Sequence, residues 1–293
     1  MVEKRVGDIL LVGFSLAGEE TVVGAPELNL CFDVGRAPRE IISLDTVCLS
    51  HGHMDHAAGL AYYFSQRAFV GNSPGTVLVP TELVGPIHDL VRVWGQIEGH
   101  PSPARIIGLE PGQDHRVRRD LVVRAFSTKH GAPALGYCVI ETRRKLKPEF
   151  ADLSGPQLVE LKKQGTTIEY ELEVPLVCYP GDTADGPHFD LEFVRRSRVV
   201  LLECTFFEPD HVRRARAGKH LHVCELAGLA RRLESPHIVL THLSRRTALR
   251  QARHYLREAV DADVIDRFSF LMERSRSPGR RPGPADQRTP STP

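Results

Sequence analysis

The segment 50–56, Ser-His-Gly-His-Met-Asp-His, holds the densest group of side chains in this chain that could bind a metal ion. It places three imidazoles and one carboxylate within six positions, directly after an apolar stretch and before a stretch of helical periodicity. In extended backbone His51 and His53 point to the same side, because side chains alternate with a period of two. A turn, eased by the intervening glycine, would let Asp55 and His56 face a second ion.

The chemistry of these ligands indicates the kind of site. Imidazole nitrogens and carboxylate oxygens, without a thiolate, suit Zn²⁺ in a catalytic site that keeps one position open for water. Mn²⁺ or Fe²⁺ could bind the same ligands. The alternative, a polar loop whose histidines only cap a helix, is disfavoured by the density of the cluster. The segment therefore predicts a catalytic site for divalent metal.

Four predicted strands run into residues of metal-ligand type. The pairs are strand 46–49 with His51, strand 121–126 with His130, strand 174–179 with Asp182 and strand 238–240 with His242. Taken singly, a histidine at a strand end is more often an ordinary polar residue, and Asp182 could be a turn residue in Gly-Asp-Thr. Their joint occurrence favours one shared site.

The elements that must position these residues are short strands and amphipathic helices. Apolar runs bounded by Gly, Pro and charged residues predict strands over 9–14, 21–23, 28–32, 46–49, 76–79, 121–126, 137–140, 174–179, 199–202 and 238–240. Helical periodicity predicts helices over 56–66, 82–97, 156–164, 223–233 and 248–260. This mixture predicts an α/β (α+β) fold in which helices cover the outer faces of sheets.

Composition predicts one folded domain followed by a tail. Hydrophobic residues make up 41% and charged residues 26% of the chain, as in soluble globular proteins. Residues 274–293 are rich in Arg, Pro and Ser, so they bury too little apolar surface to offset the entropy of ordering. We expect a catalytic domain over 1–273 and a disordered tail over 274–293, either merely solvated or serving to tether RNA.

The charge and the cysteine content of the chain limit its possible partners and its cellular compartment. Residues 1–273 carry 33 basic and 36 acidic side chains, a net charge of −3, which weighs against strong non-specific binding to nucleic acid. No run approaches the roughly 18 apolar residues that a membrane-spanning helix needs. The six cysteines form no CxxC pair, which predicts a reduced, cytoplasmic protein.

The segment SHGHMDH matches the His-x-His-x-Asp-His signature of the metallo-β-lactamase superfamily. Downstream, FSTKHGAPALGY, YPGDTAD and LTHLSRR resemble the later metal motifs of its ribonuclease Z branch, in the expected order. The chain is most similar to the short ribonuclease Z-like proteins of plants and some bacteria, roughly over 18–246. The resemblance implies a four-layer αββα sandwich with the site at its edge, and it also implies a homodimer.

The resemblance further implies two zinc ions and a division of their ligands. One ion is expected on His51, His53 and His130, the other on Asp55, His56 and His242, with Asp182 bridging them. Two such ions can generate a hydroxide near neutral pH and stabilise both the attacking and the leaving oxygens of a phosphodiester. Asp55 is in addition a candidate for orienting the attacking hydroxide.

Two further motifs, ECTF at 203–206 and KHLH at 219–222, also resemble that branch. They make His220, oriented by Glu203, the candidate general acid, because a carboxylate partner raises the basicity of an imidazole and fixes its orientation. His222 offers a second histidine for the same role, although spacing favours His220. The alternative is a helix N-cap cluster with both histidines in solvent.

The resemblance implies cleavage on the 3′ side of precursor tRNA, but two departures bear on the substrate. A long arm of the bacterial enzymes is reduced here to about 143–172. Its Gly155-Pro156 and Lys162-Lys163 pairs are candidate substrate-binding residues, and an ordinary exposed helix is the alternative. The stretch before Asp33 also lacks a Pro-x-Lys-x-Arg-Asn loop.

Three functions follow from these observations. The first is a ribonuclease Z-like phosphodiesterase. The second is a hydrolase of a small phosphodiester, thioester or sulfate ester, which the shortened arm and the slightly acidic body favour. The third, a non-catalytic RNA-binding relative, is disfavoured because every ligand position is filled.

Overall fold

Two mixed sheets of seven strands each form the centre of the protein, and the computed structural model describes residues 1–273. In spatial order, the first sheet contains β1 (Val2–Val6), β2 (Ile9–Leu16), β3 (Glu20–Ala25), β4 (Leu30–Phe32), β5 (Thr46–Cys48), β6 (Thr76–Pro80) and β7 (Arg105–Leu109). The second contains β14 (Phe268–Phe270), β13 (His237–Thr241), β12 (Val199–Glu203), β11 (Glu169–Tyr179), β10 (Leu135–Leu146), β9 (Leu121–Ser127) and β8 (Asp114–Arg118). Each sheet has an antiparallel half and a parallel half.

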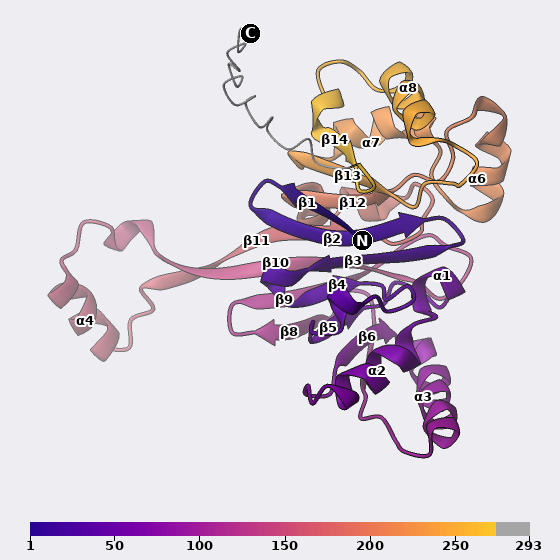
Figure 1. Ribbon diagram of the computed structural model, residues 1–293. Helices are drawn as coiled ribbons and strands as arrows, with labels where there is room; N and C mark the ends of the chain where they lie inside the picture. The colour runs from indigo at the N-terminus through magenta and orange to yellow at the C-terminus, as the bar shows by residue number, and fades with distance from the viewer. Residues whose placement is uncertain (274–293) are drawn as a thin grey trace, which may run out of the picture.

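Helices cover the outer faces of both sheets (Figure 1). The helices of the described residues are α1 (Met54–Ala57), α2 (Leu60–Phe69), α3 (Val84–Glu98), α4 (Gly155–Lys163), α5 (Glu192–Arg195), α6 (Val212–Gly218), α7 (Leu226–Arg232) and α8 (Leu249–Ala259). Helix α4 lies apart from the sheets. Strand β12 shows how one sequence serves two cores: Val199 and Leu201 enter the core between the sheets, while Val200 and Leu202 enter the core under the outer helices. The predicted four-layer αββα sandwich is confirmed.

The strands that sequence periodicity did not predict are β1, β7, β8 and β14, which are the edges of the two sheets. Edge strands are half-solvated and often charged, so they lack a clear apolar run. Strand β8, for example, is Asp-His-Arg-Val-Arg with no fully buried residue. The predicted helix 56–66 is also wrong in detail, because Gly59 packs against the backbone of Ala37 and separates α1 from α2.

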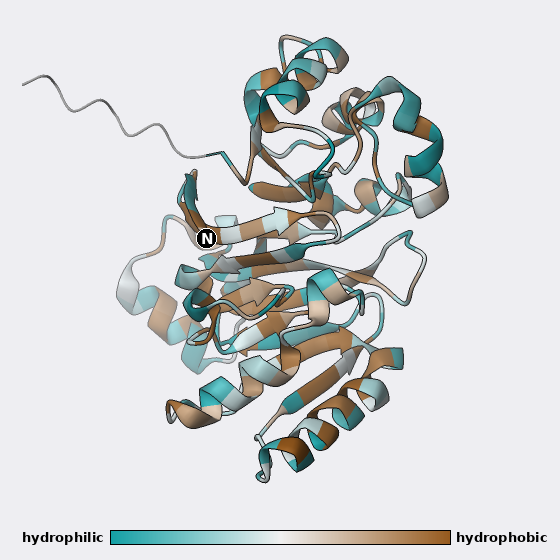
Figure 2. Ribbon diagram, turned by 45° about the vertical axis from the view of Figure 1, so that its right-hand side comes forward, coloured by the Kyte–Doolittle hydropathy of each residue, from teal (hydrophilic) through white to brown (hydrophobic). Residues whose placement is uncertain are grey.

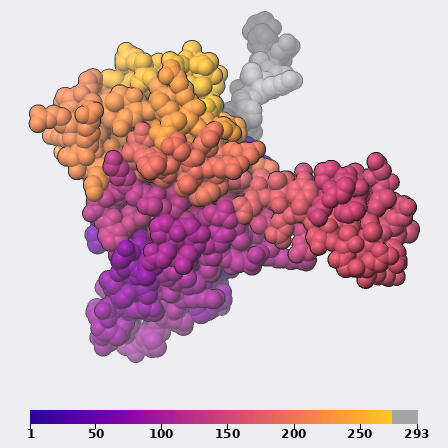
Figure 3. All heavy atoms as spheres, turned by 180° about the vertical axis from the view of Figure 1, so that it is seen from behind, coloured from indigo at the N-terminus to yellow at the C-terminus, as the bar shows by residue number. Residues whose placement is uncertain are grey.

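An arm projects from the body where β10 and β11 continue beyond their neighbours and carry α4 at the tip (Figures 1 and 3). It coincides with the region 143–172 that the sequence marks as a reduced arm. Helix α4 starts at a capping box, in which Ser154 and Gln157 exchange side-chain and backbone hydrogen bonds. The arm is therefore an ordered hairpin with a capped helix.

The sequence also led to predictions about membrane-spanning helices, the cysteines and the C-terminal tail. No helix within residues 1–273 has the length and apolar character needed to cross a membrane. All six cysteines are free thiols, and only Cys224 is exposed. The predicted tail, residues 274–293, lies outside the described residues.

Candidate metal centre

The candidate site lies at one edge of the sandwich because the relevant strands end there. Strands β9, β11, β12 and β13 run in the same direction, so the residues after them meet at the same edge of the second sheet. The loop after β5 in the first sheet joins them, since the amide of Leu135 donates to the carbonyl of Ser50 at 2.9 Å. Both sheets therefore contribute to one cluster.

The cluster brings together all seven residues predicted as metal ligands. His51, His53, His130 and Asp182 form one set, and Asp55, His56 and His242 form another, with one ligand atom from each member lying within 4.8 Å of the others in its set. The Asp182 carboxylate lies between the sets: its Oδ2 is 3.4 Å from His56 Nε2, 3.3 Å from His242 Nε2 and 3.8 Å from His51 Nε2. These are the two sets that the sequence resemblance implies.

The donor atoms fit a divalent cation. Oδ1 of Asp182 is buried and has no hydrogen-bond partner among residues 1–273, which leaves a polar atom in a costly state. Nε2 of His51 lies 2.9 Å from Nδ1 of His53, so two ring nitrogens converge on one space. Imidazole and carboxylate donors of this kind bind divalent metals.

The hydrogen bonds around Asp33 determine which nitrogen two histidines present. This buried carboxylate accepts bonds from the Ser50 amide at 2.7 Å, the Ser50 hydroxyl at 3.0 Å, the Tyr179 hydroxyl at 2.5 Å and His56 Nδ1 at 2.6 Å. Because the Ser50 hydroxyl donates to Asp33, it accepts from His51 Nδ1 at 3.0 Å. His51 and His56 therefore both turn a bare Nε2 toward the centre.

His242 is oriented in the same way from the other sheet. The Thr205 hydroxyl donates to Glu203 Oε2 at 2.8 Å and so accepts from His242 Nδ1 at 2.8 Å, which leaves Nε2 free. The backbone of His242 has a φ of +57°, a strained conformation for a residue with a side chain. Its amide donates to Ser15 Oγ at 2.8 Å, which helps to hold that conformation.

Burial and neighbouring charges set the protonation of the cluster. Burial, followed by the nearby His56, lowers the pKa of His51 to about 2, so its ring is neutral, as metal binding requires. Burial alone would raise the pKa of Asp182, but His242 and His56 hold that pKa well below its usual value. A neutral His51 ring and an ionised Asp182 carboxylate therefore meet here. Burial by itself would lower the pKa of His56, but Asp182 and Asp33 raise it well above its usual value.

His220 lies beside these ligands, and His222 does not. Nδ1 of His220 lies 2.8 Å from Glu203 Oε1, and its ring stacks on that of His242 with centroids 5.3 Å apart. Burial by itself would lower the pKa of His220, but Glu203, with help from Asp182, raises it to about 9. His222 instead accepts from the Cys224 amide at Nδ1 and donates to a backbone carbonyl from Nε2, at 3.2 and 2.9 Å.

Two glycines, which have no Cβ atom, leave room for side chains of the cluster. A Cβ on Gly218 would lie 2.9 Å from His220 Cδ2, so the ring packs directly against the end of α6. Gly181 has a φ of +68°, and a Cβ there would meet the Ser50 side chain at 2.6 Å. A larger residue at either position would displace His220 or the Asp182 loop.

Sequence reasoning missed Asp33, Ser50, Tyr179 and Thr205 as supports of the cluster. Asp33 directly follows β4, so the pattern of polar residues at strand ends could have identified it. The roles of Ser50, Tyr179 and Thr205 follow only from contacts between elements far apart in the chain.

The predicted substrate-binding residues are on the arm, away from this cluster. Gly155 and Pro156 begin α4, and Lys162 and Lys163 end it. Lys162 pairs with Glu169 at 2.7 Å, whereas Lys163 has no carboxylate partner within residues 1–273. The two pairs therefore do not join the centre itself.

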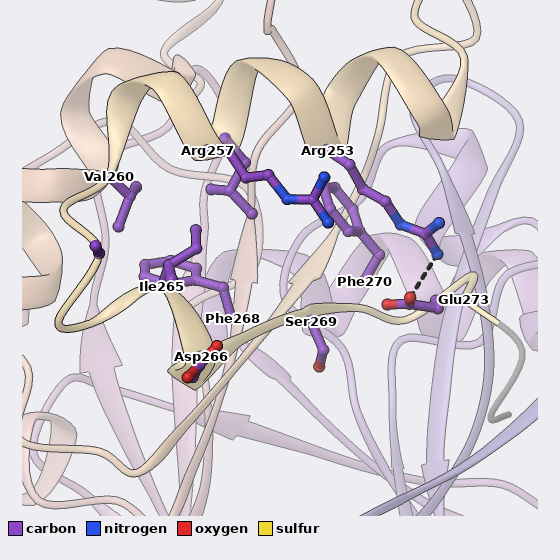
Figure 4. A pocket seen from close by; sticks show the side chains of 11 residues that line it. Arg253, Arg257, Val260, Ile265, Asp266, Phe268, Ser269, Phe270 and Glu273 are labelled. Carbon is purple, nitrogen blue, oxygen red and sulfur yellow. Dashed lines mark hydrogen bonds and ion pairs between the residues drawn. The ribbon is translucent and has the colours of Figure 1, made fainter.

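A separate cavity of about 450 Å³ lies between α8 and β14 (Figure 4). It is lined partly by Phe268, Phe270 and Arg257, and Arg253 pairs there with Glu273 at 2.5 Å. None of the candidate ligands lines it, so it is not part of the metal centre.

The chain is similar to known proteins over most of its length. A family described as "Beta-lactamase superfamily domain" matches residues 24–243. tRNase Z TRZ1 of Arabidopsis thaliana is 33% identical over 85% of this chain and 88% of its own. The chloroplastic tRNase Z TRZ2 of the same plant is 32% identical over 86% of this chain and 73% of its own, so the cytoplasmic location stays a prediction. Ribonuclease Z of Halobacterium salinarum is 31% identical over 74% of this chain and 78% of its own.

Solved structures share the fold at lower identity. Human short-form tRNase Z superposes with a TM-score of 0.57 at 17% identity, covering 80% of this chain and 92% of that chain. The metallo-β-lactamase fold protein YhfI of Bacillus subtilis superposes with a TM-score of 0.60 at 15% identity, covering 86% and 92%. These likenesses support the sandwich architecture.

Proposed function

This chain belongs to the ribonuclease Z family of the β-lactamase superfamily, and on that premise we propose that it is a metal-dependent endoribonuclease that removes 3′ trailers from precursor tRNA. The observation that carries the proposal is the position of the His220–Glu203 pair beside two sets of ligand residues that meet at Asp182. A phosphodiester cleaved there would have a proton donor within the same cluster.

Two zinc ions are the proposed cofactors, with Mn²⁺ or Fe²⁺ able to replace them. His51, His53 and His130 would hold one ion, and Asp55 with the two remaining histidines of the cluster would hold the other, with Asp182 shared. Bound there, such ions activate water and stabilise negative charge on the phosphate. The bare Nε2 atoms and the unpartnered Oδ1 of Asp182 support this assignment.

His220 is the proposed general acid. A ribose 3′-alkoxide is a poor leaving group, so its departure needs a proton. Glu203 orients the ring and favours its protonated form, while both ring nitrogens of His222 are occupied by backbone groups. Asp55 accepts from the Gly18 amide at 2.7 Å and lies 3.4 Å from His242 Nε2, which supports a ligand role and, secondarily, orientation of the attacking water.

The arm is the proposed second contact with RNA. Its tip lies far out from the body (Figure 3), where α4 presents Gly155, Pro156, Lys162 and Lys163. A lysine ammonium at that distance would contact the body of a folded RNA rather than its cleaved end. The salt bridge between Lys162 and Glu169 makes Lys163 the stronger contributor.

A second candidate function is hydrolysis of a small phosphodiester, thioester or sulfate ester. It is favoured by the net charge of −3 over residues 1–273 and by the missing basic loop before Asp33. The two candidates differ in the size of the substrate and in the need for an arm.

One experiment separates them. Zinc-loaded protein is incubated with a precursor tRNA and, in parallel, with bis(p-nitrophenyl) phosphate. Cleavage of the precursor at a single position, with a 3′-hydroxyl on the tRNA, supports the ribonuclease Z proposal. Cleavage of the small ester alone would contradict it, and Asp182→Ala serves as the metal-deficient control for both reactions.

A further inference from the structure

We infer that helix α6 and Lys219 bind the backbone phosphates of RNA beside the scissile bond, an inference that rests on the proposed function. Sequence periodicity did not predict this helix. Its basic side chains have no role in the reaction proposed above. Within the segment 209–219, four residues are basic and only Asp210 is acidic. This segment is therefore a local concentration of positive charge in a body that is slightly acidic overall.

The arginines of α6 surround the exposed part of the helix. Successive residues are about 100° apart around a helix, which places Arg213 opposite Ala215 and places Arg214 and Arg216 about 100° to either side of Ala215. Ala215 is buried against the body, and the three arginines are exposed. Figure 2 shows the hydrophilic colour of this helix at the edge of the molecule. The solvent face of α6 thus consists of guanidinium groups.

Within the described part of the chain, no carboxylate neutralises these guanidinium groups. No carboxylate of residues 1–273 forms a salt bridge with Arg213, Arg214 or Arg216, whereas Arg124 and Arg232 each contact two carboxylates. The nearby acid Glu208 is itself engaged, by the Thr247 hydroxyl at 2.5 Å and by a histidine. The α6 arginines are therefore available to an external anion.

The helix leads directly into the reaction centre. Lys219 ends α6 with a φ of +56°, and its ammonium donates to the carbonyl of His130 at 2.9 Å. The next residue, His220, donates its amide to the carbonyl of Ala215 at 2.9 Å. Because Lys219 and His220 directly follow α6, this helix adjoins both a proposed metal ligand and the proposed acid.

The arrangement suits an extended polyanion. Arginine guanidinium groups bind phosphate oxygens in bidentate geometry. Here three guanidinium groups lie on an exposed helix rather than in an enclosed pocket. Such a helix would contact successive phosphates of an RNA strand without reading its bases. The phosphates could belong to the acceptor stem or to the trailer, and binding measurements with each RNA distinguish the two.

The test is the triple variant Arg213→Ala/Arg214→Ala/Arg216→Ala, because alanine keeps helix propensity high. Affinities of the zinc-loaded protein for mature tRNA and for a trailer oligonucleotide are measured over a range of salt concentrations. Loss of three phosphate contacts should reduce the slope of log K against log salt by about two to three for the RNA segment that α6 binds. The KM for precursor tRNA should rise more than kcat falls.

The matched control is Arg105→Ala/Arg119→Ala/Arg257→Ala, which removes the same charge from exposed positions outside α6. If the control reduces the slope as much as the α6 variant, only net charge matters and the inference is wrong. An unchanged slope for the α6 variant with both RNAs would also overturn it. If the wild-type protein hydrolyses bis(p-nitrophenyl) phosphate but neither binds nor cleaves tRNA, the proposed function fails and the inference fails with it. Zinc content is checked in each variant.

Discussion

The tautomers of the candidate ligands depend on a few neutral side chains and two carboxylates. Asp33 acts directly on His56 and, through the Ser50 hydroxyl, on His51. Glu203 acts through the Thr205 hydroxyl on His242. Each chain of hydrogen bonds ends in a carboxylate, so each fixes the proton on Nδ1 and leaves Nε2 for a metal.

Replacement of Asp33 by Asn should weaken metal binding without removing any proposed ligand. The amide has one acceptor oxygen where the carboxylate has two, so the bonds to Ser50, Tyr179 and His56 cannot all persist. Losses of this type typically cost about 10- to 100-fold in metal affinity. Competition with a zinc chelator measures the affinity, and the exposed Asp120→Asn is the control; equal affinities in the two variants would contradict the role given to Asp33.

Replacement of His220 by Ala should separate the two substrates. p-Nitrophenolate leaves without a proton and a ribose 3′-alkoxide does not, so loss of a general acid should reduce RNA cleavage by about 10² to 10⁴-fold and affect the activated ester little. Rates on both substrates are measured at equal zinc content.

His222→Gln is the matched control for that variant, because His222 belongs to the same motif but its ring bonds only to backbone groups. It should alter stability rather than the ratio of the two rates. An equal loss on both substrates in His220→Ala would show that His220 stabilises charge instead of donating a proton.

At the scale of elements, the sequence predicts the central strands well and the edges poorly. Strand β12 is predicted over 199–202 and observed as Val199–Glu203, because burial on both faces makes it continuously apolar. Edge strand β8 has alternating charges and is recognised only by its pairing with β9. Helix α6 has too few apolar residues for a periodic signal, since Ala215 alone is buried.

The same contrast holds for the candidate site. The residues that follow central strands, such as His130 and Asp182, could be predicted because the strands themselves were recognisable. Supports such as Thr205 and Tyr179 could not, because each acts through a residue that is distant in the chain. Local patterns therefore predict which residues could bind a metal, whereas the packing of the two sheets determines what orients them.

Removal of the arm should affect RNA and spare the small ester. Arg144 and Glu171 are directly paired in the β10–β11 hairpin, so an Asn-Gly turn can replace residues 145–170 and close the shortened strands. We expect KM for precursor tRNA to rise by about tenfold or more through lost phosphate contacts. Steady-state kinetics on both substrates test this, and an unchanged KM would mean that the arm does not contact the RNA.

At the scale of the whole molecule, we predict that the homodimer that the family resemblance implies forms through α3. Leu90, Val93, Trp94 and Ile97 are exposed and follow one side of the helix at intervals of three and four residues. An apolar stripe of this kind on a soluble protein usually marks an interface.

The variant Trp94→Glu should therefore convert a dimer into a monomer. Sedimentation velocity measures the mass in solution, and Arg92→Glu is the control, because Arg92 lies two residues from Trp94, on the opposite side of the helix, where it pairs with Asp89. A wild-type protein that sediments as a monomer would contradict the prediction outright.

Because the proposed ligands come from both sheets, a bound ion would cross-link the two halves of the fold. His51, His53, Asp55 and His56 follow the first sheet, while His130, Asp182 and His242 follow the second. Anything that binds only the folded state stabilises it by mass action, by about 2.7 kcal/mol at a free concentration 100 times Kd, or roughly 5–10 °C in Tm for a domain of this size. Loss of the ion would then lower the stability of the folded protein as well as remove its activity. Calorimetry with zinc and with chelator measures the difference, and equal Tm values would show that the sheets hold together without the ion.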